Sequence, residues 1–159
     1  KLRNFLENMR EDVAAGMGGG DATVFHKTQL DGSLETTADA AVTLATVLTL
    51  ANSLRAKLIT HWASTGVHGV HMTASAQAFT APVATDQTTA NALLNEEKAD
   101  YNTHLSESGV HINDDSTNTV TAADATDLAS SITLANEIKA DYNAHIAAVM
   151  STPLVEQGD

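Results

Sequence analysis

Apolar residues recur at helical spacing in the last third of the chain. Four of them fall seven residues apart and three more lie between them: Leu128, Ala135, Tyr142 and Val149, with Ile132, Ile138 and Ile146. Residues spaced by three, four and seven positions share one face of an α-helix. The pattern therefore predicts an amphipathic helix of about 25 residues. Thr126 and Asp127 precede it, and their side-chain oxygens are suited to cap its first backbone N–H groups.

The same sequence pattern occurs three times along the chain. The stretch "TADAAVTLATVLTLAN" (37–52) aligns with "TAADATDLASSITLAN" (121–136), and "TAPVATDQTTANALLN" (80–95) is a more divergent middle copy. Repetition with a period of 41 to 43 residues indicates units that bury against one another what none can bury alone. The sequence thus predicts an all-α fold with three amphipathic helices joined by long extended connections.

The connections between the predicted helices contain Thr, Asn, Asp and Pro in place of an apolar stripe. Gly66 and Gly109 stand where a helix C-terminus favours a residue that tolerates a left-handed conformation. A helix of about 25 residues is about 37 Å long, and about a dozen extended residues cover a similar distance. Each connection can therefore return to the start of the next helix, which would make the helices parallel. An antiparallel three-helix bundle is the alternative.

Residues 1–20 form a separate region, and residues 21–159 form the three-repeat body. Five apolar residues in this region share one predicted helical face: Leu2, Phe5, Leu6, Met9 and Val13. Gly16 and the run Gly18 to Gly20 then end the helix and supply a flexible joint. A helix this short needs a surface to pack on, so we expect an amphipathic arm that takes part in assembly.

Charge and composition exclude several classes of protein. The formal net charge is −12, and residues 28–159 hold the whole excess of acidic side chains, so direct binding to the phosphates of a nucleic acid is not expected. The chain has no cysteine, which excludes disulfides and Cys-ligated zinc. No apolar run is long enough to cross a membrane, and the N-terminus lacks the order of a signal peptide. We expect a soluble protein that does not bind membranes.

Histidines recur at one position of the repeat. His61, His104 and His145 align with one another, and His68 and His111 follow the first two by seven residues. Imidazole binds Zn, Ni or Cu, so these five residues are the candidates for a metal site. A structural role is the alternative: each histidine would hydrogen-bond the segment that follows its helix and interact with the helix dipole. Because the third copy has Thr152 in place of a second histidine and no HxH or HExxH motif occurs, we favour the structural role and expect no bound metal or other cofactor.

Other candidate sites are weaker. The cluster "NDDSTNT" (113–119) offers oxygen ligands for Ca²⁺, but it lacks a twelve-residue loop closed by Glu, which favours a turn capped by its own side chains. No phosphate-binding glycine loop and no GxSxG motif occurs. We therefore predict no catalytic residues and no enzymatic activity. Trp62 stands where the other copies have Leu105 and Ile146, and is expected in the core.

The phrases "TNTVTAADATDLASSITLANEIKADYNAHIA" and "KADYNTHLSESGVHINDD" resemble a repeat found in structural proteins of tailed-bacteriophage particles. The resemblance covers about residues 37 to 150. The first copy departs from it, because Leu58 and Ile59 stand where the others have Tyr and Asn.

The resemblance implies a non-enzymatic virion component of the head, either a capsid decoration or part of the head-to-tail neck. Its implied partners are other virion proteins and further copies of itself, and it implies no catalytic residue. The alternative function is a helical module that binds metal through the repeated histidines.

Overall fold

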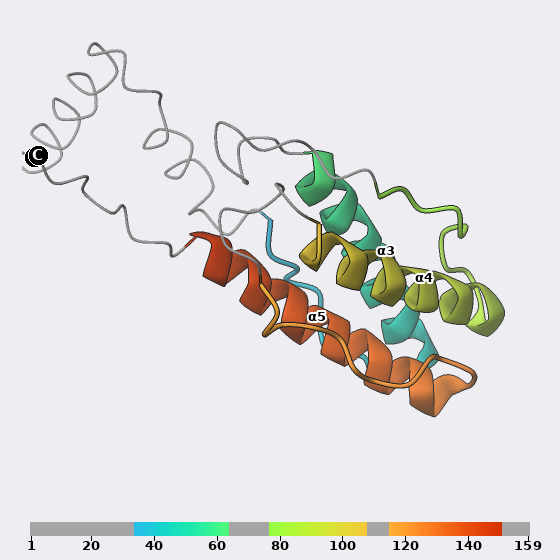
Figure 1. Cartoon of the computed structure of the whole chain (residues 1–159). Coiled ribbons are helices and arrows are strands. Elements are labelled where there is room, and N and C mark those ends of the chain that lie inside the picture. Colours follow the sequence, from blue (N-terminus) through green and yellow to red (C-terminus); the bar gives the residue numbers. More distant parts are fainter. Residues whose placement is uncertain (1–33, 64–76, 108–114, 151–159) are drawn as a thin grey trace, which may run out of the picture.

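The structure is a computed structural model that describes residues 34–63, 77–107 and 115–150. These residues form three α-helices, α3 (Leu44–Ala63), α4 (Gln87–Leu105) and α5 (Leu128–Met150), and contain no strand. Figure 1 shows the helices packed side by side, and each of them contacts the other two. The prediction of an all-α fold with three helices is confirmed for the part of the chain that the structure describes.

Several predicted features lie outside the described residues. These are the N-terminal arm (1–20) with its apolar residues, and Gly66, His68, Gly109 and His111. The connections are described only in part, over residues 77–86 and 115–127, where they have no regular secondary structure.

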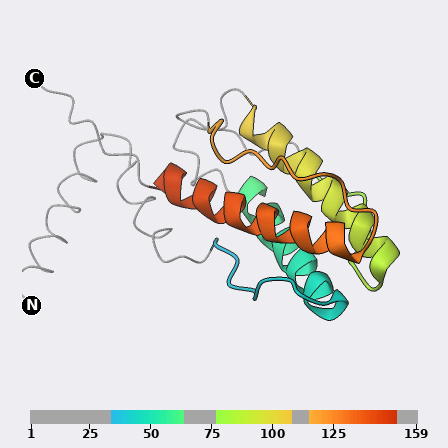
Figure 2. The same cartoon turned by 90° about the horizontal axis from the view of Figure 1, so that it is seen from below.

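All three helices run in the same direction, so their C-terminal ends lie at one end of the bundle (Figures 1 and 2). The segment 115–127 lies between α4 and α5. Its residue Ala125 is hydrogen-bonded to Asn95 of α4, and the backbone N–H of Thr121 donates to Glu137 of α5. This is the parallel arrangement, one of the two that the sequence left open.

The helices begin with the same hydrogen bonds. At the start of α4, the Asp86 carboxylate accepts from the backbone N–H of Thr89, and the Thr89 hydroxyl accepts in return from the backbone N–H of Asp86. Asp127 and Ser130 make the same pair of bonds at the start of α5, which confirms Asp127, one of the two predicted capping residues. These bonds satisfy N–H groups that have no partner within the helix.

The core is made mostly of aliphatic side chains from all three helices, together with three large aromatic rings. Its fully buried members include Val47, Leu50, Leu54 and Leu58 of α3, Leu93, Leu94 and Tyr101 of α4, and Leu134, Ala135, Ile138 and Tyr142 of α5. Trp62 is also buried, as predicted. The prediction that Leu128 lies on the buried face is wrong. Its side chain is 39 % exposed, because it is the first residue of α5 and precedes Ser131, the first buried residue of that helix.

Asparagine side chains join the helices into a ring. In each contact, the side-chain oxygen accepts from the backbone N–H of an alanine and the side-chain amide donates to the carbonyl of the same alanine, over distances of 2.7 to 3.1 Å. The pairs are Asn52 with Ala84, Asn95 with Ala125, and Asn136 with Ala41. The alanine always precedes a helix: α3 holds the start of α4, α4 that of α5, and α5 that of α3. The contacts therefore close on themselves.

Tyrosine hydroxyls of α4 and α5 make further hydrogen bonds between segments. The single hydrogen of the Tyr101 hydroxyl is shared between the carbonyls of Asn118 and Asp141, and the Tyr142 hydroxyl donates to the Leu34 carbonyl. Burial raises the pKa of both phenols, so they remain protonated donors. In α3, Leu58 takes the tyrosine position and makes no such bond, and the nearby Trp62 ring packs on Phe79 with centroids 4.9 Å apart.

Candidate functional site

The side chains of three histidines meet near the C-terminal ends of the three helices. His61 comes from α3, His104 from α4 and His145 from α5, and each side chain is fully buried. The local reason is helical spacing: His104 follows buried Tyr101 by three residues and His145 follows buried Tyr142 by three, so the rings share the apolar faces of their helices. Sequence spacing alone places the rings of His104 and His145 on the apolar side of their helices, and their burial confirms it.

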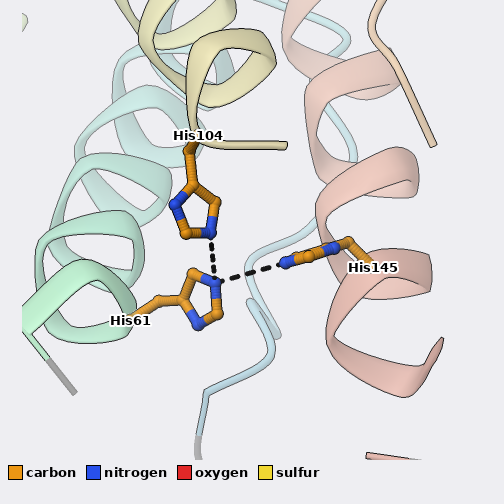
Figure 3. A group of neighbouring side chains, drawn as sticks. All are labelled: His61, His104 and His145. Atoms are coloured by element: carbon orange, nitrogen blue, oxygen red, sulfur yellow. Dashed lines mark hydrogen bonds between the residues drawn. The ribbon is translucent and has the colours of Figure 1, made fainter. Parts of the chain in front are cut away.

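The rings point toward one another (Figure 3). The Nε2 atom of His61 lies 2.9 Å from Nε2 of His104 and 3.2 Å from Nε2 of His145. One ring nitrogen from each histidine lies within 4.8 Å of the ring nitrogens of the other two. The ring planes are nearly perpendicular, at 86° for His61 and His104 and 81° for His61 and His145. Three nitrogens from three helices thus face a single point.

Acidic side chains lie behind two of the rings. Nδ1 of His145 is 2.9 Å from Oδ2 of Asp115, and Nδ1 of His104 is 3.6 Å from Oε2 of Glu107. The first distance is that of a hydrogen bond, and the second is that of an ion pair without one. Both carboxylates therefore lie on the side of the imidazole that faces away from the cluster.

Asp115 is positioned by its own turn. Its carboxylate accepts from the backbone N–H groups of Thr117 and Asn118 and from the Asn118 side chain. Burial alone would raise the pKa of Asp115, but hydrogen bonds from Asn118 and His145 outweigh it and hold the pKa below its usual value. The turn predicted for residues 113–119 is thus found from Asp115 onward. Its contact with His145 was not predicted.

His145 is neutral at neutral pH. Burial lowers the pKa of His145 below its ordinary value, and the hydrogen bond to Asp115 offsets this only in part. Because Asp115 is an acceptor, Nδ1 of neutral His145 carries the proton and Nε2 presents its lone pair to the cluster. This tautomer is the one that binds a metal through Nε2.

The structure brings together three of the five candidate histidines. No other group of three or more His, Asp or Glu side chains in the described ranges is arranged to hold a metal ion. The structural role assigned each ring a hydrogen bond to the segment after its own helix; Glu107 lies in that segment beside His104, but at 3.6 Å, which is too long for a hydrogen bond. Asp115 is hydrogen-bonded to His145 but lies in the segment that precedes that helix, so this role did not predict the contact. The mutual contact of the three rings was not predicted either.

One acidic residue was missed by sequence reasoning. Glu97 is fully buried in the core, at the repeat position that Leu54 and Ile138 occupy in the other helices. Neither carboxylate oxygen has a hydrogen-bond partner among the described residues. Burial raises the pKa of Glu97 well above its usual value, although Arg55 opposes the shift. The alignment of an acid with two apolar residues was the signal available in the sequence.

Two surface hollows lie near this end of the bundle, and neither is lined by the three histidines. One, of about 320 Å³, is lined by residues that include Arg55, Trp62 and Phe79. The other, of about 400 Å³, is lined by residues that include Leu105 and Asp115. The side chains of the histidine cluster therefore face the interior of the bundle and not these hollows.

Comparison of the chain with known protein families, with curated proteins and with solved structures found no match. None of the helices in the described ranges has the length and apolar character that a membrane span requires.

Proposed function

We propose that this chain is a non-enzymatic structural component of a tailed-phage virion, associated with the head as a capsid decoration or as part of the head-to-tail neck. The observation that carries the structural role is the closed ring of asparagine contacts. Each helix holds the segment before the next, and α5 holds the segment before α3 through Asn136 and Ala41. Because every helix is bonded to the segment before another helix, none of the three helices is left unattached at the edge of the bundle.

The proposed body consists of three copies of a repeat of about 42 residues joined by long extended connections. The alignment of the copies supports this, because Asn52, Asn95 and Asn136 occupy the same repeat position and make the same contacts. The resemblance of the repeat to those of phage structural proteins supports placing it in the virion.

Assembly would use the N-terminal arm, residues 1–20. Its apolar residues need a surface to pack on, and the glycine joint would tether the arm so that its local concentration near that surface is high. We propose that the surface belongs to another copy of this chain or to a neighbouring virion protein of the capsid or neck. The net charge of −12 supports a role that does not involve direct contact with nucleic acid.

The location is tested by labelling and counting. Antibodies against the full chain should label the heads of intact phage particles, and quantitative mass spectrometry should give the copy number per particle. Dozens to hundreds of copies would indicate a decoration, and about a dozen a ring at the neck. Absence of the chain from purified particles that are made in its presence would contradict the proposal.

The arm is tested by two matched substitutions. Leu6→Asp places a charge on the predicted apolar face of the arm, and Asn4→Asp places the same charge on the opposite face. We expect Leu6→Asp to reduce attachment to the particle by about tenfold or more, since an unpaired charge in an apolar contact is costly, and Asn4→Asp to leave it unchanged. Equal attachment of both variants and of a chain lacking residues 1–20 would contradict a role for the arm.

The alternative function, a helical module that binds metal, is favoured by one observation, the contact of three buried histidine rings. A metal site in the core is compatible with a structural role, so it is considered separately.

A further inference from the structure

The three histidines cannot satisfy one another as hydrogen-bonding groups. Each imidazole nitrogen carries either one hydrogen or one lone pair. Nε2 of His61 has two nitrogen neighbours, His104 Nε2 at 2.9 Å and His145 Nε2 at 3.2 Å. As a donor it has one hydrogen for two acceptors, and as an acceptor it has one lone pair for two donors. No placement of protons gives both contacts a full hydrogen bond at the same time.

A single cation at the centre of the cluster removes this conflict, because all three nitrogens can then present lone pairs to it. Metal–nitrogen distances for zinc are about 2.0 to 2.1 Å, so three nitrogens around one tetrahedral ion stand about 3.3 Å apart. The distances of 2.9 and 3.2 Å around His61 are close to that value. The ring nitrogens, one from each histidine, all lie within 4.8 Å of one another, so the remaining pair, His104 and His145, would move closer together on binding.

Two acidic side chains lie behind the histidine rings, where they can orient the ligands and balance the charge of a bound ion. A histidine that binds metal through one nitrogen usually donates from the other to a carboxylate, which fixes its orientation and raises its basicity. Asp115 takes that position behind His145, at 2.9 Å, and Glu107 lies 3.6 Å behind His104. Two carboxylates also balance the charge of a divalent ion in a site where all three ligands are fully buried.

We propose that His61, His104 and His145 bind one divalent transition-metal ion of the class that prefers imidazole nitrogen, with Zn²⁺ as its representative. The donor set excludes Ca²⁺ and Mg²⁺, which require oxygen ligands. The ion would take one ligand from each of α3, α4 and α5, and so join the C-terminal ends of the three helices. The site adds to the proposed structural role and does not depend on the virion location.

Binding is tested on the full chain after removal of metal with a chelator. Isothermal titration with Zn²⁺ should give one ion per chain, and Co²⁺ should give the visible absorption of a tetrahedral site with three nitrogen ligands and one further ligand. At a free Zn²⁺ concentration of about 100 times the Kd, the Tm should rise by about 5 to 10 °C. Failure of Zn²⁺ and Co²⁺ to bind the chelated chain would overturn the proposal.

Two substitutions separate the roles of the residues. His104→Leu removes a ligand but keeps an apolar core, so the chelated variant should fold while losing at least a hundredfold in Zn²⁺ affinity. Asp115→Asn keeps all three ligands and should weaken binding by about 10 to 100-fold, since it removes the carboxylate behind His145. Unchanged affinity in both variants would overturn the assignment.

Histidines outside the cluster provide the control. Replacing His26, His68, His71 and His111 together by alanine should leave the stoichiometry, the Co²⁺ spectrum and the affinity unchanged. Loss of binding in this variant would overturn the proposal, because it would place the metal elsewhere. If His104→Leu does not fold, this control and the Co²⁺ spectrum of the unmodified chain still decide the outcome.

Discussion

Substitution of Asn136 by alanine tests whether the third helix holds the start of the first. Asn136→Ala removes two hydrogen bonds, and it leaves the N–H and C=O groups of Ala41 without these partners in a position that is 1 % exposed. A made hydrogen bond contributes about 0.5 to 1.5 kcal/mol, and a buried backbone group left unpaired costs about 1 to 3 kcal/mol. Partial entry of water limits the sum, so we expect the free energy of unfolding to fall by about 2 to 4 kcal/mol.

The assay is urea unfolding followed by circular dichroism, in which Asn136→Ala should lower the midpoint without changing the slope. Asn52→Ala and Asn95→Ala remove the equivalent pairs of bonds and should cost the same within about 1 kcal/mol. Thr133→Ala is the control, because its exposed hydroxyl bonds only within α5, and it should change stability by less than about 0.5 kcal/mol. The reasoning is refuted if Asn136→Ala matches this control while the other two variants are destabilised.

Two further predictions concern acidic residues. Glu97→Leu should raise stability at neutral pH by about 1 to 3 kcal/mol, since it replaces a buried carboxyl group, whose oxygens have no hydrogen-bond partner among the described residues, by the residue type found at Leu54. The pKa of Glu97 is raised on folding, so the free energy of unfolding of the unmodified chain should fall by about 1.4 kcal/mol per pH unit as pH rises above 4.5 toward the folded pKa. Urea unfolding from pH 4.5 upward should show a smaller fall in Glu97→Leu. Equal falls in the two chains would contradict this prediction. Asp127 behaves oppositely: its pKa is lowered by the backbone hydrogen bond from Ser130, so its contribution is present above pH 3.8 and is lost as pH falls through the folded pKa. Thermal melts should therefore show a smaller loss of Tm on acidification in Asp127→Asn than in the unmodified chain, and an identical loss would count against the cap.

The helices could be predicted from the sequence because their determinants are local. Apolar spacing defined the buried faces, and Thr126 with Asp127 marked the start of α5, where the structure shows Asp127 bonded to Ser130. Leu128 was misassigned because heptad spacing gives the face of a residue but not its distance from the end of the bundle. Its exposure depends on where the neighbouring helices begin, and no local sequence pattern contains that information.

The histidine cluster was only partly predictable. Spacing from Tyr101 and Tyr142 indicated that His104 and His145 lie on apolar faces, but whether the rings meet depends on helix direction. Parallel helices bring equivalent positions to one level, whereas an antiparallel neighbour would carry its histidine to the opposite end. The sequence left both arrangements open. The contact of Asp115 with His145 depends on the path of a connection without regular structure, for which the chain carries no local signal.

The closure of the ring is tested most directly by nuclear Overhauser contacts in the isotope-labelled chain. The Asn136 side-chain NH2 donates to the Ala41 carbonyl at 3.0 Å, and the Ala41 backbone N–H donates to the Asn136 side-chain oxygen at 2.8 Å, so the protons of these two donors should give a cross peak. Equivalent cross peaks should join Asn52 to Ala84 and Asn95 to Ala125. Three such cross peaks are the predicted result. Cross peaks for Asn52 and Asn95 without one for Asn136 would contradict the closed arrangement.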